Sequence, residues 1–476
     1  MTYLSHPVVS FKRFARRLTR GPAEHDALRG INSLISAIDE NIGRAPIGDV
    51  AAALDAARVP LWDYFTWHLG SSTAGKLLAL KILNLLLAKH HFLTRSTILL
   101  SRPYGLVVDP SNGCNLACPG CVHSARAKGL QIFDWNKGLL PEQRFRGFLN
   151  RYGIYAVNLL LCNYGEPLTN PNTPRLVEIA KEYLLETVMS TNLAVSRFDA
   201  EAYVRSGLDF LILSIDGATQ SVYEKYRKNG NIRVVYRNLE NLIKAKRALR
   251  KRTPVLRWQF LAFEHNAHEI PLALEIARSL GVDQFAVETP FDVSWDDPAI
   301  RPAGIPAMNV ELDPGSEDKL SENYEPWRAE PATDSIEREF DATWTGQHAR
   351  LGRSPAEPAA PSNHTCHWLY KNMTMDAHGR ILPCCCVPGP ELDLVFSTFD
   401  AEQDCFSSEQ YQAARLFFAD PAAYRALGGH KRTPYCTKCK FDQANTAIGP
   451  EHAAQYLRAI GRRFLDAATI KILSDW

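Results

Sequence analysis

The central part of the chain alternates short apolar runs with amphipathic helical patterns, and this alternation constrains the fold more than any other feature. Six apolar runs of strand length occur between residues 104 and 288, and residues 173–183 and 234–249 between them show helical periodicity. Such alternation is typical of βα units around a mainly parallel sheet. We therefore predict an α/β fold with a partial (β/α)6 barrel, whose strands are expected at residues 104–109, 155–162, 187–191, 210–216, 256–263 and 284–288.

The regions on either side of this α/β core have different patterns. Helical patterns separated by short Gly or Pro breaks dominate the N-terminal part, where no catalytic motif occurs. A later segment rich in Pro, Ala, Asp and Glu has little periodicity, which predicts a linker or a lid. The expected divisions are a helical region at 1–100, the barrel at 101–290, the linker or lid at 291–361, a small cysteine-rich domain at 362–446 and a C-terminal helix at 447–476.

The bulk composition gives little support for a nucleic-acid or membrane-spanning protein. A formal net charge of +2 over 476 residues provides no global electrostatic argument for nucleic acid. The sequence contains no apolar run of about 18 residues and no cleavable signal pattern, so we expect a cytoplasmic protein without a spanning segment. Residues 11–20 alternate aromatic and basic side chains, which indicates a solvated helix face or a contact with an anionic membrane surface.

The cysteines are clustered, and clustering in a reducing compartment favours metal binding over disulfides. Cys114, Cys118 and Cys121 form a C-x3-C-x2-C motif directly after the first predicted strand. In parallel βα folds the loops at the carboxyl ends of the strands carry the chemistry. Three thiolates from one loop can hold three irons of a 4Fe-4S cluster and leave the fourth iron open for an outside ligand. A fully ligated ferredoxin-type cluster with a distant fourth cysteine and a zinc site remain alternatives.

The sequence around this motif resembles a known family. The segment D-P-S-N-G-C-N-L-A-C-P-G-C at residues 109–121 resembles the start of the radical S-adenosylmethionine (SAM) superfamily, in which SAM binds the open iron. The N-Y-G-E-P segment at 163–167, S-T-N at 190–192, S-I-D-G at 214–217 and, more loosely, W-Q at 258–259 with Asn266 follow successive predicted strands as in that family. The resemblance implies these SAM-binding residues: Gly165, Glu166, Pro167, Thr191, Asn192, Ser214, Asp216 and Gln259.

One position in the motif departs from the family pattern. The residue before the last cysteine is usually aromatic in this superfamily, and here it is Gly120. An aromatic side chain that stacks on the adenine of SAM is therefore expected elsewhere, and His123 is one candidate.

A second set of cysteines lies beyond the predicted barrel. Cys366, Gly379 and Cys384 follow the pattern C-x12-G-x4-C, and Cys436 and Cys439 form a later C-x2-C. This arrangement resembles the SPASM extension, or its shortened form Twitch, and implies one auxiliary 4Fe-4S cluster held by these four cysteines. A zinc knuckle built from the same residues is the alternative. Cys385 and Cys386 adjoin Cys384, which is preferred as the ligand only for its spacing from Gly379.

The family resemblance also implies an activity. With both cofactors bound, SAM is cleaved reductively to a 5'-deoxyadenosyl radical that abstracts a hydrogen atom, with electrons from a partner such as flavodoxin or ferredoxin. The first hypothesis is oxidoreductase-like chemistry, net oxidation or rearrangement, on a small molecule or natural-product intermediate. The second is crosslinking or epimerisation of a peptide or protein, and the third is a non-catalytic iron-sulfur electron carrier or sensor. Cys386 and Cys405 are candidate hydrogen-atom donors to a substrate radical.

Overall fold

The computed structural model describes the α/β core and part of the chain on its C-terminal side. The described residues are 101–124, 137–290, 297–312, 368–384, 394–399 and 404–426, together with 95–99 and the single positions 77, 78, 80, 81, 84, 85, 88, 91, 92, 366 and 436. Most of the predicted N-terminal helical region, the predicted C-terminal helix, residues 11–20, Cys385, Cys386 and Cys439 lie outside the described residues.

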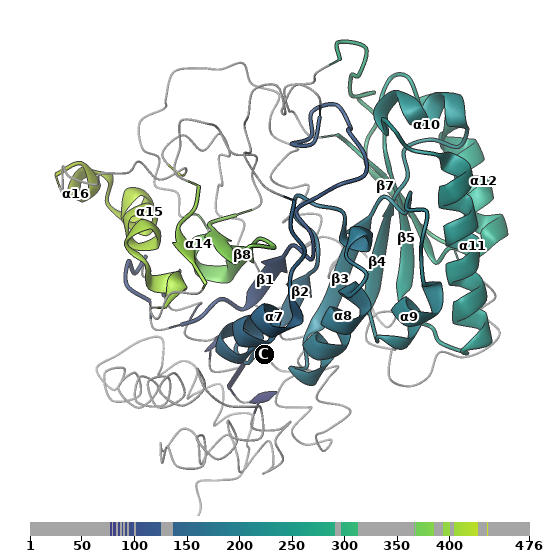
Figure 1. The fold of residues 1–476 in the computed structure, drawn as a ribbon. Helices are drawn as coiled ribbons and strands as arrows, with labels where there is room; N and C mark the ends of the chain where they lie inside the picture. Colours follow the sequence, from purple (N-terminus) through teal and green to yellow (C-terminus); the bar gives the residue numbers. More distant parts are fainter. Residues whose placement is uncertain are drawn as a thin grey trace, which may run out of the picture.

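One sheet of ten strands, in the order β10-β9-β8-β1-β2-β3-β4-β5-β6-β7, organises the molecule (Figure 1). Its six central strands are parallel and adjacent in chain order, which is the arrangement of an open βα barrel. All six predicted strands are therefore confirmed. Their bounds are β1 Gly105–Val108, β2 Asn158–Leu160, β3 Glu186–Thr191, β4 Phe210–Ser214, β5 Val255–Leu261 and β6 Gln284–Glu288.

Strand β2 is shorter than predicted because the amides of Tyr155 and Ala156 donate hydrogen bonds to the carbonyl of Tyr152, in the turn that ends the preceding helix.

The crossover helices have the patterns that the sequence predicts. The described crossover helices are α7 Glu142–Phe148 with a π-helical turn at Leu149–Gly153, α8 Thr173–Glu182, α9 Ala200–Arg205, α10 Gln220–Tyr226, α11 Ile232–Ala248 and α12 Ile270–Leu280.

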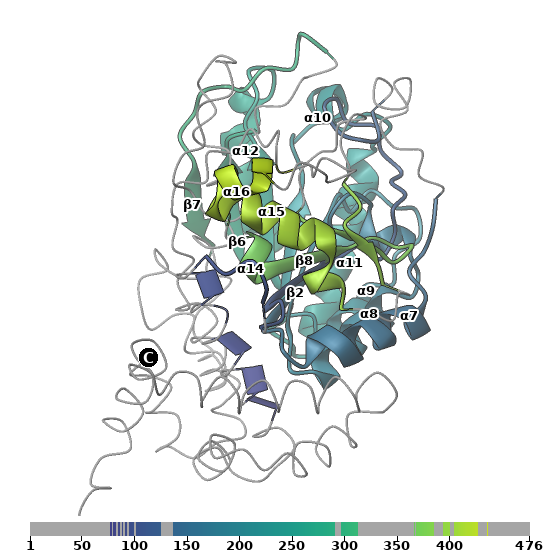
Figure 2. The same cartoon turned by 90° about the vertical axis from the view of Figure 1, so that its left-hand side faces the viewer.

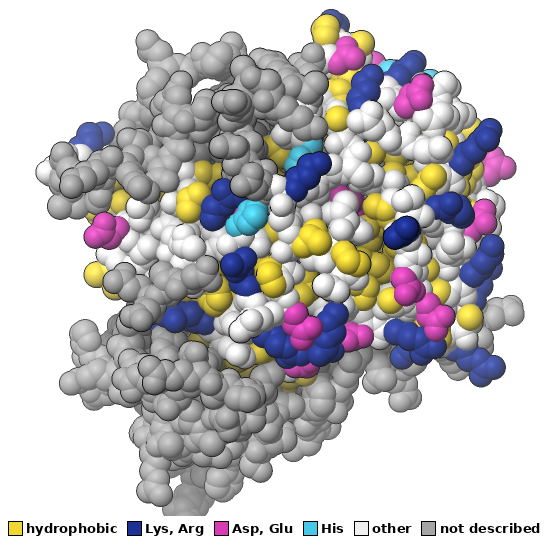
Figure 3. Space-filling view, in the orientation of Figure 1, with side chains coloured by type: hydrophobic (Ala, Val, Ile, Leu, Met, Phe, Trp, Pro, Cys, Tyr) yellow, Lys and Arg dark blue, Asp and Glu magenta, His cyan; other side chains and the backbone are white. Residues whose placement is uncertain are grey.

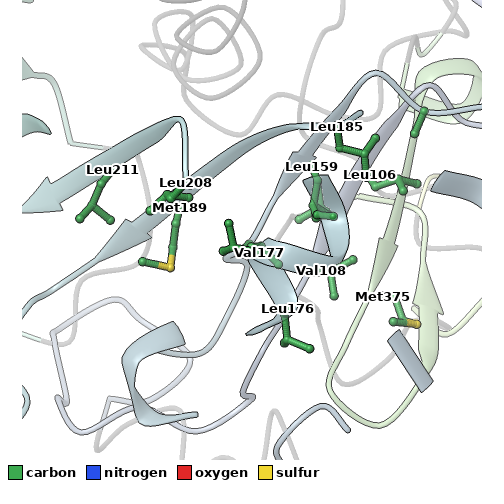
Figure 4. Packing of buried hydrophobic residues seen from close by; sticks show 14 of the residues in the cluster. Leu106, Val108, Leu159, Leu176, Val177, Leu185, Met189, Leu208, Leu211 and Met375 are labelled. Carbon is green, nitrogen blue, oxygen red and sulfur yellow. The ribbon is translucent and has the colours of Figure 1, made fainter. Parts of the chain in front are cut away.

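The two faces of the parallel sheet differ in chemistry because successive side chains on a strand point to opposite faces. One face is apolar and packs against the helices, as Figure 4 shows for residues of the strands, of α8 and of neighbouring turns: Leu106, Val108, Leu159, Leu176, Val177, Leu185, Met189, Leu208, Leu211 and Met375. The other face carries polar side chains, among them Ser190, Ser214 and Arg257. A helix-covered apolar face on one side and polar side chains on the other leave groups that can orient a ligand.

Further strands extend the six-stranded parallel sheet on both sides: β8, β9 and β10 beyond β1, and β7 beyond β6. Strands β8 (Asn372–Met375) and β9 (Arg380–Leu382) form an antiparallel hairpin, and β8 also pairs in parallel with β1 and so joins the barrel sheet. Strand β10 (Ser397–Thr398) pairs with β9. At the opposite edge β7 (Met308–Glu311) pairs with β6, inside the segment predicted to be a linker or lid. The side chains of β7 are mostly exposed, so its sequence carried no apolar alternation that predicts a strand.

The described C-terminal helices pack against one another, with α14 beside strand β8. They are α14 (Trp368–Lys371), α15 (Glu409–Ala419) and α16 (Pro421–Ala426), and they lie together in Figures 1 and 2. Asp404 joins this part to the residues before β1 and β2, because its carboxylate lies 3.6 Å from Arg102 and accepts a hydrogen bond of 3.0 Å from the Tyr152 hydroxyl. The C-terminal part therefore packs directly on the barrel.

The surface of the described part mixes charges of both signs. In Figure 3 basic and acidic side chains lie side by side over α7 and α8, where Arg146 lies 2.9 Å from both Glu142 and Glu182. Within the described ranges, we find no helix of the length and apolar character needed to cross a bilayer.

Candidate active site

The predicted cysteine motif lies at the carboxyl end of β1. We call residues 109–121 the cysteine loop. Its three thiols pack with a small apolar group formed by Leu116, Tyr226, Phe263 and Ile300, and the Cys118 side chain is buried. Cys114 and Cys121 are only partly buried. The apolar packing limits the access of water to the loop, which suits an oxygen-sensitive iron-sulfur cluster.

Several N–H groups point at the sulfur atoms of the loop. Cys114 Sγ accepts from the Leu116 amide at 3.4 Å and from Asn192 Nδ2 at 3.7 Å. Cys118 Sγ accepts from Arg227 Nη1 at 3.9 Å. Hydrogen bonds to sulfur stabilise negative charge on a thiolate and tune the potential of a bound cluster.

The thiols of the loop fit a metal centre. Burial raises the pKa of Cys114 to about 12, and Glu166 adds to the rise. Burial also raises the pKa of Cys118 to about 11, although the charge of Arg227 acts in the opposite direction. At neutral pH these sulfurs therefore keep their protons unless a metal cation replaces them. In the part of the chain that the structure describes, no three His, Cys, Asp or Glu side chains are yet arranged closely enough to surround an ion.

Asp109 fixes the loop after β2 against the cysteine loop. Its buried carboxylate accepts backbone hydrogen bonds from Asn163 at 2.8 Å, Tyr164 at 3.1 Å and Gly165 at 3.3 Å. The Glu166 amide in turn donates to the Gly113 carbonyl at 2.9 Å. The two loops therefore form one backbone assembly, which places the predicted G-E-P turn directly beside the cysteines.

Gly165 lies where no side chain fits. A Cβ at this position would lie 1.6 Å from the Ser111 carbonyl oxygen. We expect Gly165→Ala to lower the free energy of unfolding by about 1–3 kcal/mol or more, because backbone rather than a flexible side chain must move. Urea denaturation measures this change. Gly147→Ala is the matched control, since its nearest contact is 3.4 Å away and Ala is the better residue inside α7; equal losses in both variants would contradict the prediction.

Ionisation of Asp109 is expected to make stability depend on pH. Burial raises the pKa of this carboxyl from 3.8 to about 7, although its three backbone hydrogen bonds oppose the shift. Because the folded protein then holds the proton more strongly than the unfolded chain, the free energy of unfolding falls as pH rises from about 4 to about 7, by up to about 4 kcal/mol. Asp109→Asn cannot ionise, so the difference in stability between wild type and variant should change by about 3 kcal/mol between pH 4.5 and pH 8. Parallel pH profiles of the two proteins would show that Asp109 does not titrate in this range.

Glu166 links the loop after β2 to the end of β3. Its carboxylate accepts hydrogen bonds from Thr191 Oγ1 at 2.6 Å, the Asn192 amide at 2.8 Å and the Leu168 amide at 3.0 Å. Burial raises the pKa of Glu166, and these three hydrogen bonds act in the opposite direction. Pro167 begins the 3-10 turn Pro167–Thr169 on its C-terminal side. The structure therefore brings four predicted residues together near Cys114: Glu166, Pro167, Thr191 and Asn192. Glu166 nevertheless uses most of its acceptor capacity within the protein.

The predicted residues of β4 and β5 fall into two groups. Ser214 Oγ lies 3.1 Å from Ser190 Oγ, and Gln259 on β5 is the register partner of Ser214. These three side chains are partly exposed on the polar face. Asp216 is fully buried, and its carboxylate accepts hydrogen bonds from the Leu261 amide at 2.7 Å and from Arg227 Nε. Asp216 thus orients Arg227, whose guanidinium donates to Cys118 in the cysteine loop.

Asn266 has a similar role in the next loop. Its side-chain amide donates to the carbonyls of Asp216 at 3.0 Å and Leu261 at 2.9 Å, and its oxygen accepts from the Phe263 amide. These bonds hold the loop after β5 against the loop after β4.

The sequence did not identify Arg227, Asp109 and Asn115 as parts of the site. Arg227 lies between Lys225 and Lys228, a charged pattern typical of a solvated surface, but its guanidinium is largely buried over the Tyr226 ring at 5.2 Å. Asn115 Oδ1 accepts from Asn192 Nδ2 at 3.1 Å. The only local signals are that Asp109 ends a predicted strand and that Asn115 is a polar residue inside the cysteine motif.

The backbone explains why the motif has a glycine at position 120. Gly120 has φ +76°, in the left-handed region that residues with a Cβ disfavour. His123, the candidate for stacking on adenine, has its ring Nε2 2.9 Å from the Tyr164 carbonyl. Aromatic side chains do lie next to the cysteine loop, because the rings of Tyr226 and Phe263 are 4.5 Å apart within its apolar surroundings.

Three cysteines of the second set lie in the described part of the chain. Cys366 and Cys436 are buried in the main core, and Cys384 packs against it. Cys405 is also buried, at 1% exposure, with its Sγ 3.6 Å from the Thr398 carbonyl. Its amide bonds to the Tyr152 hydroxyl, before β2, whereas the cysteine loop follows β1. This placement at the opposite strand ends favours a packing role for Cys405 over hydrogen-atom donation.

Comparison with known proteins agrees with this site. Residues 108–256 match the family model described as the Radical SAM superfamily. The chain is 25% identical over 177 residues to the AdoMet-dependent heme synthase of Methanosarcina barkeri, which covers 37% of this chain and 47% of that protein. It is 30% identical over 151 residues to the mycofactocin maturase MftC of Mycobacterium tuberculosis, which covers 31% of this chain and 36% of that protein.

Among solved structures, Streptococcus suis SuiB bound to S-adenosylmethionine aligns with 16% identity and a TM-score of 0.40, over 70% of this chain and 69% of SuiB. The chain spans less than half the length of the two curated relatives. The family match covers the cysteine loop, the G-E-P turn and the polar ends of β3 and β4, so residues 108–256 of this chain form a radical SAM domain.

Proposed function

We propose that the protein is a radical SAM enzyme that cleaves SAM reductively and abstracts a hydrogen atom from a small-molecule or natural-product substrate. The observation that carries the proposal is the cysteine loop, in which three thiols, one buried and two partly buried, lie at the carboxyl end of β1 with N–H donors at Cys114 and Cys118. When bound, the cluster and SAM supply the 5'-deoxyadenosyl radical. The residues of this chain supply the ligands, the orientation and the exclusion of water.

The surrounding side chains suit the polar groups of SAM. Cys114, Cys118 and Cys121 would hold three irons, and the open iron would take the amino and carboxylate groups of SAM. Glu166 retains acceptor capacity that suits an ammonium group, although three protein donors already bind its carboxylate. Hydroxyl and amide groups on the polar face suit ribose and carboxylate oxygens, and they come from Ser190, Ser214 and Gln259.

An auxiliary 4Fe-4S cluster held by Cys366, Cys384, Cys436 and Cys439 is the second part of the proposal. Its support is that Cys384 and Cys436 both lie within electrostatic range of Tyr411 on α15, and that the Cys366 carbonyl accepts a hydrogen bond from the Leu369 amide in α14. Burial raises the pKa of the Tyr411 hydroxyl, and the thiols of Cys384 and Cys436 lie within electrostatic range and add to the rise. A cluster with four protein ligands cannot bind substrate and can serve as an electron acceptor, which favours net oxidation.

Maturation of a peptide or protein is the second candidate function. Its support is the 30% identity to the mycofactocin maturase MftC, whereas the similarity to a heme synthase supports a small-molecule substrate. Both candidates need the same site up to hydrogen abstraction. A gene for a short precursor peptide beside this gene would favour maturation.

Anaerobic reconstitution followed by SAM and dithionite tests the proposal. We expect about eight irons per chain if both clusters form, and 5'-deoxyadenosine among the products. Iron without 5'-deoxyadenosine would instead support a non-catalytic electron carrier or sensor. Zinc in place of half of the iron would indicate a zinc knuckle at the second cysteine set.

A further inference from the structure

Arg415 is a buried cation whose hydrogen bonds go to neutral groups. It lies on α15 with 0% exposure, and it donates to the Leu369 carbonyl from Nε at 3.0 Å and to the Phe406 carbonyl from Nη2 at 2.8 Å. The remaining nitrogen, Nη1, is buried and has no hydrogen-bond partner among the described residues. A buried charge needs pairing, because loss of its hydration costs several kcal/mol.

Aromatic rings rather than carboxylates surround this guanidinium. Its Cζ lies 4.6 Å from the ring centre of Phe406, 5.1 Å from that of Tyr411 and 5.9 Å from that of Tyr370. Asp404 is within electrostatic range, but its carboxylate is engaged by Arg102 and the Tyr152 hydroxyl. Burial lowers the pKa of Arg415 to about 10, so the side chain is still charged at neutral pH.

The contacts of Arg415 and Tyr411 lead to the segments that carry the second cysteine set. These two residues are one helical turn apart and therefore share a face of α15. Arg415 bonds to Leu369, whose own amide donates to the Cys366 carbonyl at 3.3 Å. The Tyr411 hydroxyl donates to the Leu382 carbonyl at 3.0 Å, two residues before Cys384.

The same helix face also lies near the later cysteine. Tyr411 is within electrostatic range of Cys436 as well as of Cys384. One face of α15 thus contacts both described segments of the C-x12-G-x4-C pattern and lies within electrostatic range of Cys436, and the same face carries the charge of Arg415.

We infer that Arg415 supplies the buried positive charge that stabilises an anionic metal–thiolate centre held by the second cysteine set. The inference rests on the auxiliary cluster proposed above. A 4Fe-4S cluster with four thiolate ligands has a net negative charge that grows on reduction, so a nearby cation favours the reduced form and raises the reduction potential. A guanidinium suits this role because it stays protonated when buried and is less strongly hydrated than an ammonium ion.

The test measures the potential of the auxiliary centre alone. It uses the full chain with Cys114, Cys118 and Cys121 changed to Ala, reconstituted anaerobically with iron and sulfide and titrated by EPR. In this background Arg415→Met, which fills the space among the rings without the charge, is expected to lower the reduction equilibrium constant at least about tenfold, or about 59 mV for a one-electron couple. Arg415→Lys keeps the charge and should retain most of the wild-type potential.

The control is Arg425→Gln, which removes an exposed cation from the neighbouring helix α16 and should leave the potential unchanged because solvent and salt screen it. Iron bound with an unchanged potential in Arg415→Met would overturn the role of Arg415 and leave the auxiliary centre intact. An equal fall in the Lys variant would also overturn it, since charge would then not be the cause. If the background chain binds no iron, or zinc instead, both the auxiliary cluster and this inference fail, whereas SAM cleavage by the wild-type chain remains a separate measurement.

Discussion

Replacement of Cys114, Cys118 or Cys121 by Ala should reduce the formation of 5'-deoxyadenosine from SAM by more than about 100-fold. Loss of an outer-shell partner already costs about 10–100-fold in metal affinity or activity, and removal of a direct ligand costs more. The loop offers three thiols for this centre, so none of the three can be replaced by another residue of the motif. Product quantification after reaction with SAM and dithionite, with iron counted in the same samples, measures the effect.

Cys162→Ala is the matched control for these variants. Cys162 lies just beyond β2, and burial raises its pKa, with further contributions from Asp109 and Glu166. The substitution removes one thiol from the same end of the sheet without touching the motif, so iron content and 5'-deoxyadenosine should stay close to wild type. Survival of SAM cleavage in any of the three motif variants would disprove the assignment of the cluster.

Asp216→Ala should destabilise the protein and loosen the cysteine loop. The carboxylate of Asp216 is fully buried and pairs with Arg227, whose guanidinium also reaches Cys118. Removal of one partner of a buried pair typically costs about 3–5 kcal/mol, and the 13% exposure of Arg227 places the expected loss near about 3 kcal/mol. Denaturant unfolding measures the loss, and iron retention reports on the loop.

Two further variants serve as controls: the first breaks an exposed ion pair, and the second separates the effect of the buried charge from the contact with sulfur. Glu201→Ala breaks the exposed pair with Arg205, in which both side chains are 59% exposed, and should change stability by less than about 1 kcal/mol. The double variant Asp216→Ala/Arg227→Met removes both buried charges, so it should recover much of the stability but not the iron retention. Full recovery of both properties would mean that Arg227 has no effect on the cluster.

The six parallel strands could be predicted because each is a short, largely buried run between helices of clear periodicity. The G-E-P turn and the ends of β3 and β4 were also predictable as members of the site, since parallel strands place their carboxyl ends at one edge. The bonds within the site were not predictable from the motifs. Glu166 and Asp216 were expected to face SAM, yet protein donors engage both carboxylates.

The cysteine motif shows most clearly what the sequence determines and what the tertiary structure adds. By itself the sequence determined three thiols on one loop, at the end of the first strand of a βα fold, because residue spacing and strand order are local properties. Only the tertiary structure decided what surrounds them. Asp109 and Arg227 contact the loops through long-range packing, and β8 joins β1 through backbone hydrogen bonds that leave no side-chain pattern. The buried charge of Arg415 likewise appears only once α15 packs against the cysteine-bearing segments, since an isolated Arg in a helix is ordinarily exposed.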